Sequence, residues 1–346
     1  MTSANTKRLR VLGLLGAAVI AGCGLVAEAE AQPAPMKITV TAVGRPPIFS
    51  NTFIDVAESL GYFKDAGLDV TMRWFQRAAD TAKIILTGEA DVGWTATTPG
   101  LNLMASGGEV VAIAGQNTQD WLVASNAPDV KTCSDLKSKT VAADGINNAR
   151  YLYLGAVLES CKLSLKDVTP IDLANAALVK AGIAGQVHNG VFHVDELAEI
   201  AFRTGQDWHQ IPAPASIAKD LHYGMILTTP KEIANNHEAL VRFVEVWIRT
   251  QRFMSSPAPQ DKEKFAAIVS KASQIDPKVA MKAIEQLQAI GYWQNNLGLD
   301  KDQMMRQEAQ LVATGTIKKP DAPSFDRIVN PSIYEEASKR LQNKPQ

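Results

Sequence analysis

The stretch MKITVTAVGRPPIFSNTFIDVAESLGYFKDAGLDVTMRW, residues 36–74, decides the fold class. Residues 36–42 alternate apolar and polar side chains, which is the period-two pattern of a β-strand. Residues 52–63 then place apolar side chains on one helical face, and Gly67 ends this segment before a second strand at residues 68–74. Strand, helix and strand in succession predict an α/β sheet with parallel pairing and helices on its faces.

The same alternation continues to residue 204. Further strands are expected at 90–94, 110–115, 122–125, 140–143, 168–172, 190–192 and 223–228, and helices at 80–87, from 98, at 148–161, 175–182 and 195–204. In the helix from residue 98, Thr98 is expected as the N-cap and Pro99 as the first helical residue. From Pro230 the chain reads as mainly helical, and the apolar face of one amphipathic helix holds Leu240, Phe243, Val244, Trp247 and Ile248.

Two α/β units of this kind predict two lobes, because a chain of roughly 315 residues after the leader exceeds one ordinary core. We expect a leader at 1–31, the first part of lobe 1 at 32–122, lobe 2 at 123–223, and the return of lobe 1 with the C-terminal helices at 224–346. The strands at 122–125 and 223–228 are interpreted as two hinge crossings. The C-terminal helices are expected to pack on lobe 1.

The N-terminus has the pattern of a signal peptide. Lys7, Arg8 and Arg10 precede an apolar run over residues 11–26. A membrane anchor is the alternative, but the run of roughly 16 residues falls short of the ~20 that a spanning helix needs.

Two cleavage sites compete within this leader. Residues 20–23 end in Cys23 and resemble a bacterial lipoprotein box, so cleavage there would leave a lipid anchor on Cys23. Residues 29–31 form an A-x-A-like site, and cleavage after Ala31 would release a free periplasmic protein that begins at Gln32. The apolar run extends past Cys23, which favours the second site.

The charge balance excludes some partners. The leader holds three of the 35 basic and two of the 36 acidic residues, which leaves 32 positive and 34 negative charges, a net of −2. A nucleic-acid partner would require a basic stripe, so none is expected.

Cys133 and Cys161 are the two cysteines beyond the leader and form a candidate disulfide in an oxidising compartment. If residues 140–143 form a strand and residues 148–161 the helix that crosses back over it, the end of the helix returns beside the segment before the strand. The alternative is a pair of buried free thiols.

Motifs for catalysis or cofactors are missing from the sequence. There is no phosphate loop, dinucleotide fingerprint, nucleophile elbow or H-E-x-x-H motif. His188, His193 and Asp195 form the densest group of metal-ligand residue types, but their spacing fits no zinc pattern. We therefore predict a protein without cofactor or metal, and not an enzyme.

Several segments resemble one family of extracytoplasmic proteins. Residues 57–70, AESLGYFKDAGLDV, are similar to a signature of periplasmic solute-binding proteins for nitrate, taurine, aliphatic sulfonates and thiamine precursors. Residues 86–94, 135–142 and 223–227 resemble further segments of this family in the same order. The family "GqvDAgv" segment differs here, because His188 and Asn189 replace the usual Asp and Ala. The resemblance implies a two-lobed type II periplasmic binding fold.

The resemblance also implies a function and partners. Such proteins capture a small solute between their lobes by hinge closure and deliver it to an ABC permease and its ATPase. We expect a monomer that works this way. A sensory protein signalling to a membrane receptor is the alternative. An enzyme on the same scaffold is disfavoured, since the cysteine-rich iron motif of the yeast-type thiamine-pyrimidine synthases is absent.

Ligands of open α/β sheets bind at the carboxyl ends of strands, so strand ends nominate the site. The candidate ligand-binding residues are Arg45, Pro46, Phe49, Gln76, Arg77, Trp94, Thr95, Thr97, Asn117, Trp121, Asn147, Asn148, Arg150, Phe192, His193 and Tyr223. Arg45 and Arg77 would pair with an oxyanion, and Asn147 and Asn148 would present a helix N-terminus to it. The aromatic residues favour a small organic anion, a sulfonate or aromatic carboxylate; a pyrimidine-type thiamine precursor is the alternative.

Overall fold

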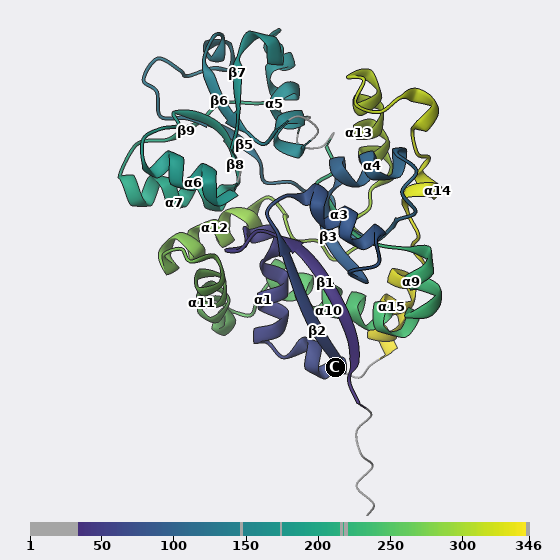
Figure 1. Cartoon of the computed structure of the whole chain (residues 1–346). Coiled ribbons are helices and arrows are strands. Elements are labelled where there is room, and N and C mark those ends of the chain that lie inside the picture. The colour runs from purple at the N-terminus through teal and green to yellow at the C-terminus, as the bar shows by residue number, and fades with distance from the viewer. Residues whose placement is uncertain (1–33, 146–147, 174, 215–216, 218–220, 344–346) are drawn as a thin grey trace, which may run out of the picture. The chain divides into compact units, whose positions relative to one another are not determined.

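Strands and helices alternate from residue 36 onward in the computed structural model (Figure 1). The structure describes residues 34–145, 148–173, 175–214, 217 and 221–343. Residues 35–346 hold together as one unit. The predicted leader, Cys23 within it and Asn147 lie outside the described residues. Over the part of the chain that the structure describes, no helix is long and apolar enough to cross a membrane.

Five strands form the first sheet, in the order β2-β1-β3-β10-β4. They are β1 (Met36–Val43), β2 (Leu68–Phe75), β3 (Val92–Ala96), β4 (Val111–Gln116) and β10 (Gly224–Thr228). β1 runs parallel to β2 and β3, whereas β10 is antiparallel to β3 and β4. Every residue of β3 and β10 is buried, as expected for central strands of a sheet that is covered on both faces. The edge strand β4 is buried throughout as well, and Ala112 on it forms a bridge with Val329. This sheet and its helices are the first lobe.

The helix predicted in the opening stretch is divided into α1 (Thr52–Ser59) and α2 (Tyr62–Asp65). Gly61 lies between them with φ +76°, a left-handed conformation that glycine adopts without steric cost. Gly67 follows α2 with φ +65°, and a Cβ atom there would lie 2.9 Å from the guanidinium of Arg242. Both the turn and the close approach of Arg242 therefore require glycine at position 67.

Two further helices of the first lobe are α3 (Ala78–Leu86) and α4 (Thr97–Ala105). The prediction of Thr98 as the N-cap of α4 is wrong, because the helix begins at Thr97 and its N-cap is Ala96. The hydroxyl of Thr98 instead accepts a hydrogen bond of 2.9 Å from Gln307 Nε2. The Thr98 side chain, predicted to cap the helix, thus bonds instead to a residue far along the chain, Gln307.

The second sheet has the order β7-β6-β8-β5-β9. Its strands are β5 (Leu122–Ser125), β6 (Thr140–Ala143), β7 (Thr169–Asp172), β8 (Asn189–Phe192) and β9 (His209–Gln210). The helices of this second lobe are α5 (Ala149–Ser160), α6 (Asn175–Ile183) and α7 (Val194–Thr204). β6 is parallel to β7 and β8, and β5 is antiparallel to β8 and β9. The predicted fold class is confirmed: two mixed α/β sheets, each with its own helices (Figure 1).

The C-terminal part is helical, as predicted. Its helices are α9 (Pro230–Asn235), α10 (His237–Ser255), α11 (Lys262–Ser273), α12 (Pro277–Ala289), α13 (Lys301–Ala313), α14 (Phe325–Ile328) and α15 (Ser332–Asn343). The predicted apolar face of α10 is buried, and Trp247 packs edge to face on Phe53 with a centroid distance of 4.6 Å. α10, α11 and α15 cover the first lobe, but α12 packs on α7 of the second lobe (Figure 1). The C-terminal part therefore contacts both lobes.

The two connections between the sheets lie beside the strands that were interpreted as hinge crossings. β5 and β9 are paired inside the second sheet and β4 and β10 inside the first, so the chain crosses from one sheet to the other after β4 and returns after β9. In the second connection, His222 is buried and its ring nitrogens bond to Thr97 Oγ1 at 2.7 Å and to the carbonyl of Gly298 at 2.8 Å. Burial lowers the pKa of the His222 imidazole to about 4, so it anchors this connection to the first lobe as a neutral ring.

Cys133 and Cys161 are joined by a disulfide with an S–S distance of 2.01 Å. Their Cα atoms lie 6.0 Å apart, at the distance usual for such bridges. Cys161 follows α5, and Cys133 lies before β6, as the proposed crossover requires. The bridge therefore ties the end of α5 to the segment that precedes β6.

Candidate functional site

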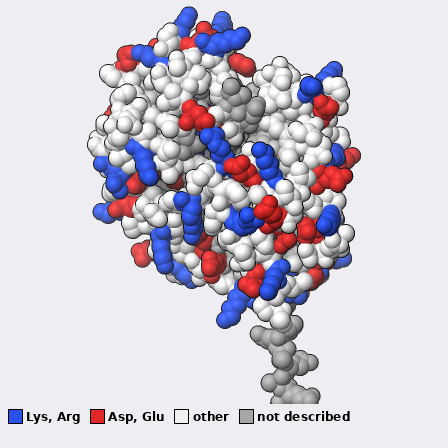
Figure 2. Space-filling model, viewed as in Figure 1, with Lys and Arg blue, Asp and Glu red and all other residues white. Residues whose placement is uncertain are grey.

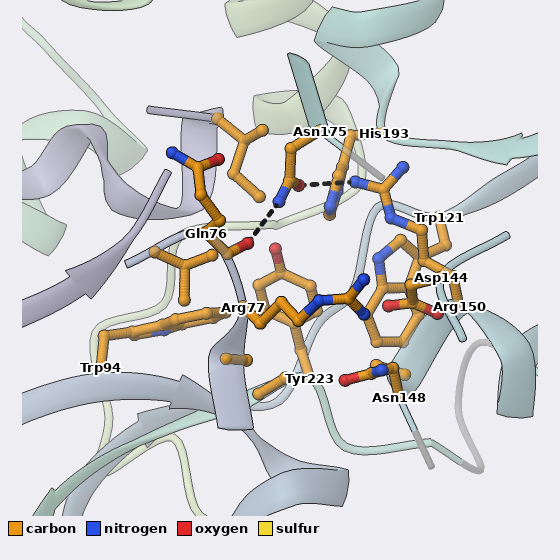
Figure 3. A pocket seen from close by; sticks show the side chains of 15 residues that line it. Gln76, Arg77, Trp94, Trp121, Asp144, Asn148, Arg150, Asn175, His193 and Tyr223 are labelled. Carbon is orange, nitrogen blue, oxygen red and sulfur yellow. Dashed lines mark hydrogen bonds between the residues drawn. The ribbon is translucent and has the colours of Figure 1, made fainter. Parts of the chain in front are cut away.

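A cavity of about 60 Å³ lies between the lobes, where strands of both sheets end (Figure 3). The first lobe lines it with Val43, Ile48, Gln76, Arg77, Ala78, Trp94 and Ala96, the second lobe with Asp144, Asn148, Ala149, Arg150, Asn175 and His193, and the two connections with Trp121 and Tyr223. Asp144 follows β6 and His193 follows β8, so both lie at the carboxyl ends of parallel strands. This edge of an open α/β sheet is where ligands bind. We call this space the main cavity.

Aromatic rings form one wall of the main cavity. The ring of Tyr223 lies 5.1 Å from that of Trp121 and 5.5 Å from that of Trp94, centroid to centroid. All three side chains are almost fully buried. The indole N–H groups of Trp94 and Trp121 have no hydrogen-bond partner among the described residues. This wall suits a flat organic group.

Arg150 is the buried cation of the site. It comes from the first turn of α5 and makes a two-fold ion pair with Glu196, with N–O distances of 2.7 and 2.9 Å. Its Nη1 also donates to the carbonyl of Val191 at 3.1 Å, and its Nη2 to Oδ1 of Asn175 at 3.0 Å. Burial alone would lower the pKa of the guanidinium, but the charge and hydrogen bonds of Glu196 together with the charge of Asp144 raise that pKa overall. The charge of Arg150 is thus already matched within the second lobe.

Asp144 occupies the place that a ligand anion was predicted to take. One oxygen of Asp144 accepts a hydrogen bond of 2.9 Å from the backbone N–H of Tyr151, in the first turn of α5. The protein's own carboxylate therefore uses part of the positive end of this helix. Burial raises the pKa of the Asp144 carboxyl to about 6, although the charge of Arg150 lowers it in part.

His193 links the first connection to the second lobe. Its Nδ1 lies 2.7 Å from Oδ1 of Asp120, which precedes Trp121, and its backbone N–H donates to Glu196 at 3.0 Å. Burial lowers the pKa of the imidazole, but the charge and hydrogen bond of Asp120 together with the charge of Glu196 raise it overall. The His193 ring is thereby held against the aromatic wall, 6.1 Å from the ring of Tyr223.

Two polar contacts bridge the lobes at the main cavity (Figure 3). Nδ2 of Asn175 donates to the backbone carbonyl of Gln76 at 3.1 Å, and the same side chain accepts from Arg150. Arg77 pairs with Asp172 across the two lobes at 3.1 Å, and both side chains are half exposed. Asn175 therefore connects the buried ion pair of the second lobe to the first lobe.

Half of the candidate site residues line the main cavity. These are Gln76, Arg77, Trp94, Trp121, Asn148, Arg150, His193 and Tyr223. They come from both lobes and both connections, so the structure brings together residues that are far apart in the sequence. Their roles in ligand binding remain predictions.

The other candidates lie elsewhere, apart from Asn147, which is outside the described residues. Pro46 and Arg45 border a second cavity, and Phe49 is fully buried in the core of the first lobe. The hydroxyl of Thr95 donates to the carbonyl of Ala78 at 2.7 Å, and that of Thr97 bonds to His222. The ring of Phe192 packs on Trp208, and Asn117 does not line the main cavity.

Arg45 shows why a loop residue can point away from a predicted site. Its guanidinium pairs with Asp55 of α1 at 2.9 Å and lies over the ring of Trp74, 4.6 Å from its centroid. These local partners hold Arg45 on the first lobe. The predicted pair of arginines around one oxyanion is therefore not assembled at the main cavity.

Asn175 is the main functional candidate that the sequence reasoning missed. It follows β7, so the rule that nominated the ends of the neighbouring strands β6 and β8 would have found it too. Its backbone has φ +51°, a left-handed conformation that asparagine tolerates better than most residues.

No group of three or more His, Cys, Asp or Glu suited to a metal occurs among the described residues.

A second cavity, of about 450 Å³, adjoins the main one and shares Ile48, Gln76 and Asn175 with it. It lies between the loop that follows β1, the helices α6 and α7, and the turn between α11 and α12. Asp195, Glu196 and Glu199 of α7 line it. We call it the acidic cavity.

Two α/β lobes with a cavity at their facing strand ends define the class of two-lobed periplasmic binding folds. The family model described as NMT1/THI5 like matches residues 49–258, and the chain belongs to this family. This confirms the resemblance on which the sequence analysis relied. No curated protein matches the sequence.

Solved structures share the fold. The nitrate-binding protein NrtA from Synechocystis PCC 6803 has a TM-score of 0.73 at 13% identity, with 90% of each chain covered. The alkanesulfonate-binding protein SsuA from Xanthomonas axonopodis pv. citri, bound to MOPS, has a TM-score of 0.68 at 15% identity and covers 86% of this chain and 99% of its own. SsuA from Escherichia coli gives 0.67 at 13%, covering 87% and 99%. At these identities the likeness concerns the fold alone.

Proposed function

We propose that this protein is the extracytoplasmic solute-binding component of an ABC-type importer and closes its two lobes around a small organic solute. The observation that carries the proposal is the main cavity, which both lobes and both connections line and which Asn175 bridges. A solute in contact with both lobes stabilises the closed form by its difference in affinity for the closed and open forms. The solute-binding relatives with the same fold support this function.

The ligand we propose is flat and rich in hydrogen-bond donors. The aromatic wall offers a face for a planar group. Arg150 is paired with Glu196, and Arg77 with Asp172, so neither cation requires a ligand anion to balance it. Asp144 supplies an acceptor instead. These contacts favour the pyrimidine-type ligand over the organic anion. Binding of an organic anion stays a prediction, with Arg77 and Asn148 as the residues that would contact it.

A thermal-shift panel tests the proposal. It would contain aliphatic sulfonates, aromatic carboxylates, pyrimidines and organic amines, each against the purified mature protein. A ligand at 100 times its dissociation constant should raise the free energy of unfolding by about 2.7 kcal/mol. No stabilisation by any class, together with no bound solute in native mass spectra of protein from its own host, would refute the solute-binding function.

Deletion of the gene separates transport from sensing. Loss of uptake of the identified solute supports delivery to a permease and its ATPase. Intact uptake with lost induction would support the sensory alternative. Intact-mass analysis of the exported protein distinguishes a free N-terminus at Gln32 from a lipid-bearing Cys23, and we expect Gln32.

A further inference from the structure

The acidic cavity contains buried oxygen atoms without partners. Oδ1 of Asp195, Oε2 of Glu199 and Oγ of Ser273 have no hydrogen-bond partner among the described residues. These residues line the acidic cavity from α7 and from the last turn of α11, and each is more than nine-tenths buried, with exposed fractions of 4%, 7% and 8%. Buried polar atoms are nearly always hydrogen-bonded, so the two carboxylate oxygens call for a missing donor, and the hydroxyl of Ser273 can accept from the same donor.

The charges around the acidic cavity leave a negative excess on α7. Glu196 is neutralised by Arg150, and Arg45 by Asp55, so neither contributes a free charge. The second oxygen of Glu199 reaches Arg203 only at 3.6 Å. Asp195 has no ion pair in the described part of the chain, and because burial raises its pKa to about 7, it carries its full negative charge only above that pH.

Lys180 is the remaining cation on the lining of the acidic cavity. It is exposed and forms no ion pair with the described carboxylates. Space-filling representation shows acidic and basic side chains interspersed over the visible face, with no extended patch of one sign (Figure 2). The negative excess is thus local to the buried lining and not a property of the visible surface.

The turn after α11 adds to the preference for a cation. Ser273 ends α11, a helix of 12 residues, and Gln274 caps it in the left-handed conformation with φ +59°. The last turn of a helix carries the negative end of the helix dipole. Carboxylates of α7 and the carboxyl end of α11 therefore face the same cavity.

We propose that the acidic cavity binds an ammonium group of the solute whose flat part occupies the main cavity. An ammonium group has three N–H donors and one positive charge, which matches three acceptor atoms and a negative excess. The two cavities share the lining residues Ile48, Gln76 and Asn175, so a molecule that spans both would pass beside the hydrogen bond between Asn175 and Gln76. This inference rests on the proposed solute-binding function and assigns a second, cation-binding part to that site.

Benzylammonium and benzyl alcohol are the probes, because they share a ring and differ in the charge of one group. Isothermal titration of the full mature protein should give a Kd for benzylammonium at least about 10-fold lower than that for benzyl alcohol. Glu199→Gln should raise the Kd of benzylammonium about 10-fold and leave that of benzyl alcohol unchanged. Asp195→Asn should do the same, and its thermal unfolding shows whether it folds.

Glu109→Gln is the matched control, because it removes one negative charge from an exposed position outside both cavities and should change neither Kd. Equal affinities for the two probes, no binding of benzylammonium, or full binding by Glu199→Gln and Asp195→Asn would each overturn the ammonium site. If one of these outcomes occurs while a panel compound without an ammonium group still binds, only this inference fails and the proposed solute-binding function stands.

Discussion

Asn175 is expected to control how often the lobes are closed. Its Nδ2 group makes the 3.1 Å hydrogen bond to the carbonyl of Gln76, and its Oδ1 atom accepts from Arg150. Asn175→Asp keeps the acceptor for Arg150 but removes the donor, so it isolates the bond between the lobes. A hydrogen bond contributes a net of about 1 kcal/mol, so the ratio of closed to open molecules should fall about fivefold.

Distance measurements between spin labels test this expectation. Labels at Lys64 and Gln186 report on the two lobes, because both side chains are exposed and lie in different lobes. In the presence of a bound panel compound, Asn175→Asp should broaden the distribution toward long distances and raise the apparent Kd by the same factor. Asn175→Ala, which loses both bonds, should do at least as much.

Asn235→Asp is the control for the added negative charge, since Asn235 is exposed at the end of α9 and lines neither cavity. It should leave both the distance distribution and the Kd unchanged. If Asn175→Asp has the same closed population and Kd as the wild type, the reasoning that this side chain stabilises closure is refuted.

Three further predictions concern binding and stability. Arg77→Ala should weaken the binding of a panel anion by at least ~1.5 kcal/mol. Asp172→Asn removes only the half-exposed ion pair with Arg77 and should change the free energy of anion binding by ~1 kcal/mol or less. Equal effects of the two variants in calorimetry would mean that Arg77 does not touch the ligand. Replacing Cys133 and Cys161 by alanine should lower the free energy of unfolding by about 3 to 4 kcal/mol for the 28-residue loop, and a denaturant midpoint unchanged from the wild type would contradict this. Burial raises the pKa of Asp195 to about 7, so the folded state holds a proton that the unfolded state loses near pH 4, and the free energy of unfolding should fall from pH 4 to 7. Asp195→Asn should remove this part of the pH dependence. Parallel pH profiles of the variant and the wild type would contradict the raised pKa.

Most of the fold could be predicted from local patterns. Strands such as β1 and helices such as α10 are long enough for their periodicity to identify them, and their apolar faces are buried as expected. The two-residue strand β9 has no such signal, because it exists only through its pairing with β5. The break at Gly61 was missed since an apolar helical face continues across it.

The site was harder to predict because partners decide where polar side chains point. The positions of strand ends correctly predicted that Arg150 and Arg77 line the main cavity. They could not show that Glu196 pairs with Arg150 and Asp172 with Arg77. They also could not place Arg45, which Asp55 holds on α1. Long-range ion pairs leave no trace in sequence spacing, so the sequence could not predict the charge of the ligand.

The contact between α12 and α7 has a consequence for how fast a solute can leave. A pure hinge would separate the lobes around two connections, but here a packed pair of helices joins them as well. Opening must therefore slide or separate this helix pair, which adds a shear component to the motion. Since the contact is made beside the acidic cavity, the residence time of the solute depends on helices that need not touch it.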